Sequence, residues 1–78
     1  LDQLPLHQSA TITAIDWAQL DVREGRRMRE LGFATGEEIE LIHGGGWFTR
    51  DPIACRIGRM TVAIRKSHAA AITVTQTP

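Results

Sequence analysis

Apolar and polar residues alternate along much of this 78-residue chain, and this period of two predicts short β-strands. The first expected strand covers residues 9–15, which are rich in threonine and isoleucine. Four later segments repeat the alternation, with apolar side chains at Ile39 and Leu41, at Ile53, Cys55 and Ile57, at Met60, Val62 and Ile64, and at Ile72 and Val74. Gly58 and Arg59 predict a tight hairpin between the second and third of these segments.

The segment before the second strand has a different period and predicts an amphipathic helix of about ten residues. Asp21, followed three residues later by Glu24, resembles a capping box that opens a helix. Apolar or small residues then recur at every third position, at Val22, Gly25, Met28 and Leu31. Gly32 is placed to close the helix in a left-handed conformation, with Phe33 folded back onto the last turn. Gly36 supplies a second positive-φ position before the next strand.

These elements predict a mainly β fold with one short α-helix, arranged as a small closed or partly closed five-stranded barrel. A flat sheet of such short strands leaves long edges exposed, whereas a barrel does not. The alanine-rich residues 66–70 add one expected helical turn before the last strand. The length predicts a single domain over residues 1–78, because chains divide into domains only at greater length.

The charge balance disfavours a general attraction to nucleic acids or anionic membranes. Nine lysine and arginine residues match nine aspartate and glutamate residues, so the formal net charge is zero. The single cysteine, Cys55, forms no internal disulfide, and no apolar run is long enough to span a bilayer. The first residues do not resemble a signal peptide. We therefore expect a soluble, cytoplasmic protein that is not embedded in a membrane.

The titratable residues do not predict an enzyme. His7, His43 and His68 lie in three separate segments, whereas a nucleophile and its base need a third group to orient them. Cys55 lies on the apolar side of its strand and is expected to be a small core residue. His7 and His68 are expected at the surface. No catalytic residue is assigned.

A weak metal site is expected at the base of the loop that contains the sequence GGGWFTR. His43 and Asp51 bracket this loop, so a hairpin brings them close together. One imidazole and one carboxylate hold an ion such as Fe(II) or Zn(II) weakly, because stable sites use three or four protein ligands. The protein therefore requires no cofactor, and a bound ion would be weakly held or shared between molecules.

Two segments are candidate protein-binding surfaces. Trp47 and Phe48 lie at the tip of the glycine-rich loop, where they either cover one end of the barrel or form an exposed apolar anchor for a partner. The polar side of the helix carries four arginines, which form either a solvated face or a docking surface for an acidic protein patch: Arg23, Arg26, Arg27 and Arg29. Nucleic-acid binding is a further alternative, which the interleaved glutamates disfavour.

Four sequence motifs follow one another in an order typical of a known family. They are LDQLPLHQSATI, MRELGFATGEEIEL, Asp51-Pro52-Ile53 and GRMTVAIRKSHAAAITV. In this order they resemble the FeoA family of small bacterial ferrous-iron transport accessory proteins, which is similar in turn to the C-terminal barrel of iron-dependent repressors. His7 stands where the family usually has glycine, Thr35 where it usually has proline, and Arg50 where it usually has glycine.

The resemblance implies a Src-homology-3-like barrel that docks on the cytosolic part of FeoB, a membrane transporter of ferrous iron with a GTP-hydrolysing domain. The implied role is that of an accessory and regulatory module of iron uptake. The expected contact residues are Trp47, Phe48, Arg23, Arg26 and Arg27. A metal-binding or metal-sensing barrel using His43 and Asp51, and a small nucleic-acid-binding barrel using the helix arginines, stay open as alternatives. A weak homodimer is also considered.

Overall fold

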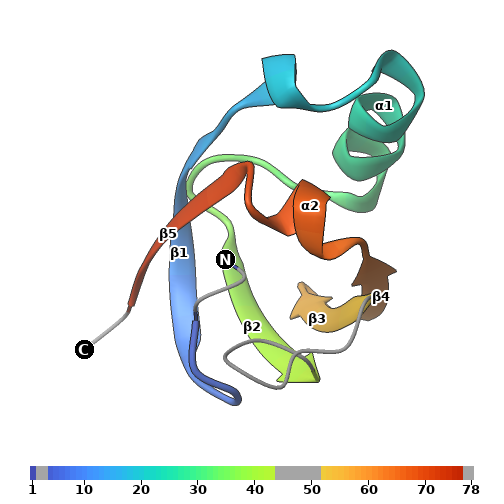
Figure 1. The fold of residues 1–78 in the computed structure, drawn as a ribbon. Coiled ribbons are helices and arrows are strands. Elements are labelled where there is room, and N and C mark those ends of the chain that lie inside the picture. Colours follow the sequence, from blue (N-terminus) through green and yellow to red (C-terminus); the bar gives the residue numbers. More distant parts are fainter. Residues whose placement is uncertain (2–3, 44–51, 77–78) are drawn as a thin grey trace.

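The computed structural model describes residues 1, 4–43 and 52–76, and five strands in these ranges form one antiparallel sheet (Figure 1). The elements in chain order are β1 (Ser9–Ile15), the 3₁₀ helix η1 (Trp17–Gln19), α1 (Val22–Leu31), β2 (Glu38–His43), β3 (Ile53–Ile57), β4 (Met60–Ile64), α2 (Lys66–Ala69) and β5 (Ile72–Gln76). The strand order across the sheet is β4-β3-β2-β1-β5. The predicted mainly β fold with one short main helix is confirmed.

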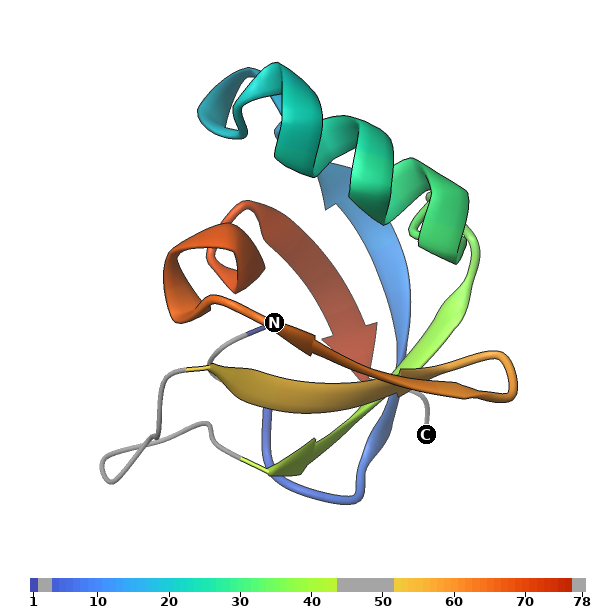
Figure 2. The ribbon, with the colours of Figure 1, turned by 90° about the vertical axis from the view of Figure 1, so that its right-hand side faces the viewer.

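The sheet is strongly curved, with β1 and β5 on one side, β3 and β4 on the other, and β2 between them (Figure 1). The start of β1 pairs with β2, where Ser9 lies opposite Glu40. Along its other edge β1 pairs with β5, as far as Ile15 opposite Ile72. Helix α1 lies across one end of this curved sheet (Figure 2). The curvature therefore encloses one apolar interior, which α1 covers from that end.

The tight hairpin predicted between β3 and β4 is present. Ile57 lies opposite Met60, so Gly58 and Arg59 alone make the turn. Gly58 has a φ of 59°, a left-handed conformation that glycine adopts at little steric cost. The predicted boundary between these two strands is therefore correct.

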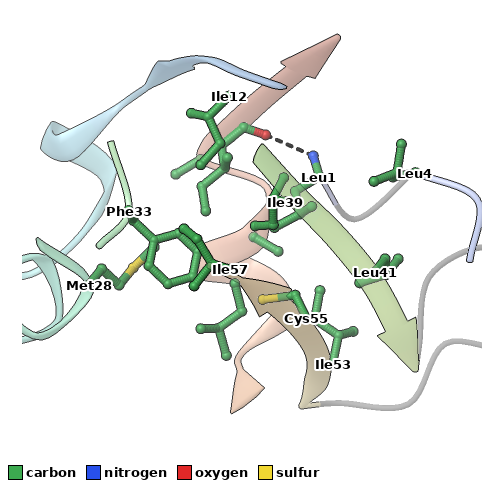
Figure 3. Close-up of a cluster of buried hydrophobic side chains, with 14 of the residues drawn as sticks. Leu1, Leu4, Ile12, Met28, Phe33, Ile39, Leu41, Ile53, Cys55 and Ile57 are labelled. Atoms are coloured by element: carbon green, nitrogen blue, oxygen red, sulfur yellow. Dashed lines mark hydrogen bonds between the residues drawn. The ribbon is translucent and has the colours of Figure 1, made fainter. Parts of the chain in front are cut away.

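The core is built mainly from the alternating positions of the strands and from two side chains near the end of α1 (Figure 3). Buried residues outside these elements complete it: Leu1, Leu4, Leu20, Ala69 and Ala71. Phe33 is only 1% exposed and lies beside Met28 of the helix and Ile57 of β3. The backbone nitrogen of Leu1 donates a hydrogen bond to the carbonyl oxygen of Ile72, at 2.8 Å, which ties the first residue to β5. Each large side chain buried in this way contributes about 1.5–3 kcal/mol of transfer free energy.

Both ends of α1 are capped as the sequence predicts. The Asp21 carboxylate accepts a hydrogen bond from the Glu24 amide at 2.7 Å, which satisfies one of the free amides of the first turn. Gly32 has a φ of 104°, and the Phe33 amide donates to the Met28 carbonyl at 3.0 Å. The Glu24 side chain does not complete the capping box but pairs with Arg27 at 2.8 Å.

Two apolar positions lie outside the core, contrary to the predicted pattern. Val22 is 78% exposed, although it belongs to the predicted apolar stripe of the helix. Residues three apart on a helix are separated by about 300°, so such a stripe turns by about 60° per step and by about 180° between Val22 and Leu31. Met60 is 43% exposed and lies next to the two-residue turn of the β3–β4 hairpin, opposite Ile57.

Candidate partner-binding surface

The arginines expected to form a docking surface are all exposed on α1, but they have different surroundings. In the part of the chain that the structure describes, Arg23 and Arg26 make no ion pair or side-chain hydrogen bond. Arg27 is held between Glu24 and β4. Arg29 lies over the indole ring of Trp17, with its guanidinium carbon 4.4 Å from the ring centroid. The four side chains are therefore not equivalent as partner contacts.

Arg27 connects the helix to the edge of the sheet. Its Nη1 atom lies 2.8 Å from Glu24 Oε1, and its Nη2 atom donates to the carbonyl oxygen of Ala63 in β4, at 3.1 Å. Such exposed contacts stabilise only modestly, but they fix the direction of the side chain. Arg27 therefore has a structural role that the sequence did not suggest.

Trp17, which the sequence analysis did not assign to any site, forms one wall of a groove between η1 and α1. Its ring is partly buried against the core, and the hollow beside it has a volume of about 360 Å³. We call this feature the Trp17 groove; its lining residues are Trp17, Leu20, Asp21, Val22, Gly25, Arg26, Arg29 and Glu30. The available sequence signal was a tryptophan four residues before the predicted helix cap Asp21, close enough in the chain to pack on the first helical turns.

Gly25 leaves the side of the groove next to Trp17 without a side chain. A Cβ atom added at this glycine would lie 3.7 Å from Cε3 of Trp17, an ordinary van der Waals distance. The backbone of Gly25 is helical, so no unusual conformation requires glycine here. The groove is therefore open because residue 25 is glycine, although the surrounding structure would accept an alanine at this position.

Trp47 and Phe48, predicted to form the loop surface, lie outside the described residues. Asp51, one of the two predicted metal ligands, also lies outside them. His43 is exposed at the end of β2. Within residues 1, 4–43 and 52–76, no three histidine, cysteine, aspartate or glutamate side chains gather to hold a metal ion. The predicted pairing of His43 with Asp51 stays a prediction.

The other two histidines have unlike environments. His7 is at the surface, as expected, with its Nδ1 atom 3.6 Å from Glu40 Oε2. The expectation for His68 was wrong, because its side chain is only 20% exposed and packs where α2 meets α1. Its Nδ1 atom is buried 3.5 Å from Glu24 Oε1 and has no hydrogen-bond partner among the described residues. The sequence could not show this contact, since Glu24 and His68 are far apart in the chain.

Cys55 lies in the core, as its place in the alternating pattern predicts. Its side chain is fully buried in β3, and burial raises the pKa of its thiol from an ordinary value of 9.0 to about 11. A thiol is a nucleophile and a metal ligand mainly as the thiolate. The position of Cys55 therefore serves packing.

None of the helices in the described ranges is long and apolar enough to cross a membrane.

Comparison with protein families gives one clear match. The FeoA domain family matches residues 1–76, which is nearly the whole chain. No curated protein is similar enough in sequence to count as a match. FeoA is a family of small transport-related proteins and is not a known enzyme family.

Several solved structures have the same fold. FeoA of Stenotrophomonas maltophilia is 34% identical, with a TM-score of 0.78 over 96% of this chain and 87% of that one. It is described as a zinc complex of a prokaryotic SH3 domain protein, with a suggested role as a ferrous iron transport activating factor. The iron(II) transport protein A of Clostridium thermocellum is 29% identical, with a TM-score of 0.79 over 97% of this chain. This chain spans only 44% of that protein's length.

A third structure, FeoA of Chlorobium tepidum, is 22% identical and has a TM-score of 0.81 over 99% of this chain and 69% of that one, which supports the fold alone. The predicted Src-homology-3-like architecture is confirmed by these neighbours. The order of strands, the capped helix and the match over residues 1–76 lead to one assignment. The chain belongs to the FeoA family.

Proposed function

We propose that this protein is a cytoplasmic accessory factor of bacterial ferrous iron uptake and that it docks on a FeoB-type GTPase transporter. The observation that carries the proposal is the FeoA family match over residues 1–76. The Stenotrophomonas relative, described as a suggested activating factor of ferrous iron transport, supports the same pathway. Binding to the transporter would favour one of its nucleotide-linked conformations and so change the rate of iron uptake.

The chemistry of the described residues agrees with a binding module. The exposed guanidinium groups of Arg23 and Arg26 have no intramolecular partner in the described ranges, so they are available to carboxylates of another protein. Trp47 and Phe48 are proposed as further contacts, on the basis of sequence alone.

The experiment measures binding and uptake together. The full-length transporter from the same organism is placed in lipid nanodiscs, and binding of the protein is followed by calorimetry with and without a GTP analogue. Uptake of radioactive ferrous iron is measured in cells that lack the protein and in cells complemented with it. Saturable binding and restored uptake are expected. Unchanged uptake in the deletion strain together with no binding would reject the proposal.

A second, weaker function is binding of a divalent metal ion by His43 and Asp51, which the zinc complex of the Stenotrophomonas relative favours. Calorimetric titration with Zn(II) tests it, and His43→Ala is expected to abolish the heat that the wild-type chain gives. His7→Ala is the matched control, because His7 is also exposed but lies elsewhere. Equal heats for the wild type and His43→Ala would exclude this site.

A further inference from the structure

The Trp17 groove combines exposed apolar surface with arginines that have no intramolecular carboxylate partner. Val22, at its edge, is 78% exposed, and the ring of Trp17 is only partly buried. An isolated exposed valine is unremarkable, but here it adjoins an aromatic ring and a hollow of about 360 Å³. Partner-binding sites typically have such an aromatic or apolar centre with polar groups around it.

Gly25 is a second observation that sets the groove apart. Glycine in the middle of a helix is less favourable than alanine, yet an alanine Cβ would find only an ordinary contact with Trp17. The chain therefore gives up helix stability at a position where its own packing does not demand glycine. Any longer side chain here would occupy the groove, so glycine keeps the groove open. Local rules of this kind are often broken at functional sites.

The charges at the groove favour an acidic ligand. Arg26 and Arg29 line it, and Arg23 is exposed on the same helix; none of the three has an ion-pair partner among the described residues. Two carboxylates are also present, but that of Asp21 already accepts the Glu24 amide at the helix start. Asp21 keeps its negative charge in this hydrogen bond, so Arg26 and Arg29 balance Asp21 and Glu30 across the lining. The excess positive charge comes from Arg23, which is exposed on the same helix.

We propose that the Trp17 groove receives an acidic segment of the partner protein, with an apolar side chain of that segment placed against Trp17 and Val22 and its carboxylates on Arg26 and Arg23. The inference rests on the proposed function, since the partner is taken to be the ferrous-iron transporter. The inference goes beyond the proposed function by assigning the contact with the transporter to a surface that includes Trp17 and Gly25.

The test uses the full chain and the full-length transporter in nanodiscs, with variants at positions that line the groove. Val22→Ser removes the exposed apolar group, Arg26→Glu reverses the free charge, and Gly25→Leu fills the hollow. Met60→Ser and Arg59→Glu are matched controls, because they make the same kinds of change at exposed positions of the β3–β4 hairpin. Thermal unfolding of every variant verifies that it is folded.

Each groove variant is expected to weaken binding by at least about tenfold, as truncation of a central contact typically does, whereas the controls bind like the wild type. The effect of Arg26→Glu is expected to shrink at high salt. If the wild type binds and the groove variants bind equally well, the groove is not the contact while the proposed function stands. If the wild type does not bind, both fail. If Arg26→Glu weakens only the binding of a single-stranded oligonucleotide, the ligand is nucleic acid and the proposal is wrong.

Discussion

The guanidinium group of Arg29 lies over the indole of Trp17, 4.4 Å from the ring centroid, and joins the last turn of α1 to the short helix that precedes it. A cation above an aromatic face is attracted by the ring quadrupole. Both residues line the Trp17 groove, so the contact forms part of its wall. The relationship therefore bears on both the stability of the helix and the shape of the candidate binding surface.

Arg29→Ala is expected to lower the free energy of unfolding by about 0.5–1 kcal/mol, because it removes the cation–π contact with Trp17. Urea denaturation followed by circular dichroism measures the change. Arg23→Ala is the control, since Arg23 is exposed on the same helix and contacts no partner in the described ranges. Its effect is expected to stay within about 0.5 kcal/mol. Equal effects of the two substitutions would show that the stacking contributes nothing.

Gly25→Ala and Gly32→Ala are expected to change stability in opposite directions. Alanine at Gly25 stabilises the helix by about 0.8–1 kcal/mol, because the backbone is helical and the added Cβ meets only Trp17 Cε3 at 3.7 Å. Alanine at Gly32 destabilises by about 1–2 kcal/mol, because a φ of 104° places its Cβ in a strained position. Midpoints of urea unfolding test both. A destabilised Gly25→Ala variant would contradict the open space found beside Trp17.

His7→Gly is expected to stabilise the fold by about 0.5 kcal/mol. His7 is the one non-glycine residue with a positive φ, 62°, in the described ranges. Relief of this strain, about 1–2 kcal/mol, exceeds the entropy lost by a more flexible unfolded chain, about 0.5–1 kcal/mol.

Thermal unfolding measures the effect of His7→Gly, and His7→Val serves as the opposite control. A β-branched residue tolerates positive φ poorly, so the valine variant is expected to be less stable than the wild type. The hydrogen bond from the residue 7 amide to the Leu41 carbonyl, 2.8 Å long, is kept in both variants. If valine is tolerated as well as glycine, the backbone strain at this position is negligible.

The stability of the protein is expected to fall between pH 9 and 11 through the titration of Cys55. Burial raises the pKa of the folded thiol from 9.0 to about 11, so in this window the unfolded chain has lost a proton that the native chain retains. The slope of stability with pH is therefore negative. The stability conferred by keeping the thiol neutral is fully present below pH 9, and about 3 kcal/mol of it is lost well above pH 11.

The comparison with Cys55→Ala isolates this component. Other groups titrate in the same range, but they do so in both proteins, so the difference in unfolding free energy reports on the thiol. The wild type is expected to be the more stable protein below pH 9. Above pH 9 the difference is expected to narrow, because ionisation of the thiol destabilises the wild type and alanine has no group that titrates. A difference independent of pH would show that ionisation of the thiol is not coupled to folding.

Local patterns in the sequence were sufficient for the five strands and the two α-helices, but not for the 3₁₀ helix η1. The alternation through Ile53, Cys55 and Ile57 predicted three buried side chains, because successive residues of a strand face opposite sides. The cap at Asp21 and the left-handed Gly32 were also predictable, since both depend on hydrogen bonds and backbone angles within a few residues. The prediction was wrong at Val22, where a period of three was read as one face of a helix.

The candidate binding surface was less predictable. The sequence indicated that the helix arginines form a surface, but it did not indicate that Arg27 binds the Ala63 carbonyl or that Arg29 stacks on Trp17. It placed His68 at the surface, whereas its Nδ1 atom is buried beside Glu24. These contacts join segments from different elements, and side-chain spacing along the chain carries no information about them.

The amino-acid sequence by itself determined the strands, the capped helix, the family and the mainly β architecture, because hydrophobic periodicity and turn chemistry act over short distances. Only the tertiary structure decided which exposed residues share a surface. The placement of α1 beside η1 brings Trp17, Gly25 and Arg29 together, since their contact depends on how the two elements pack and not on the period of either one.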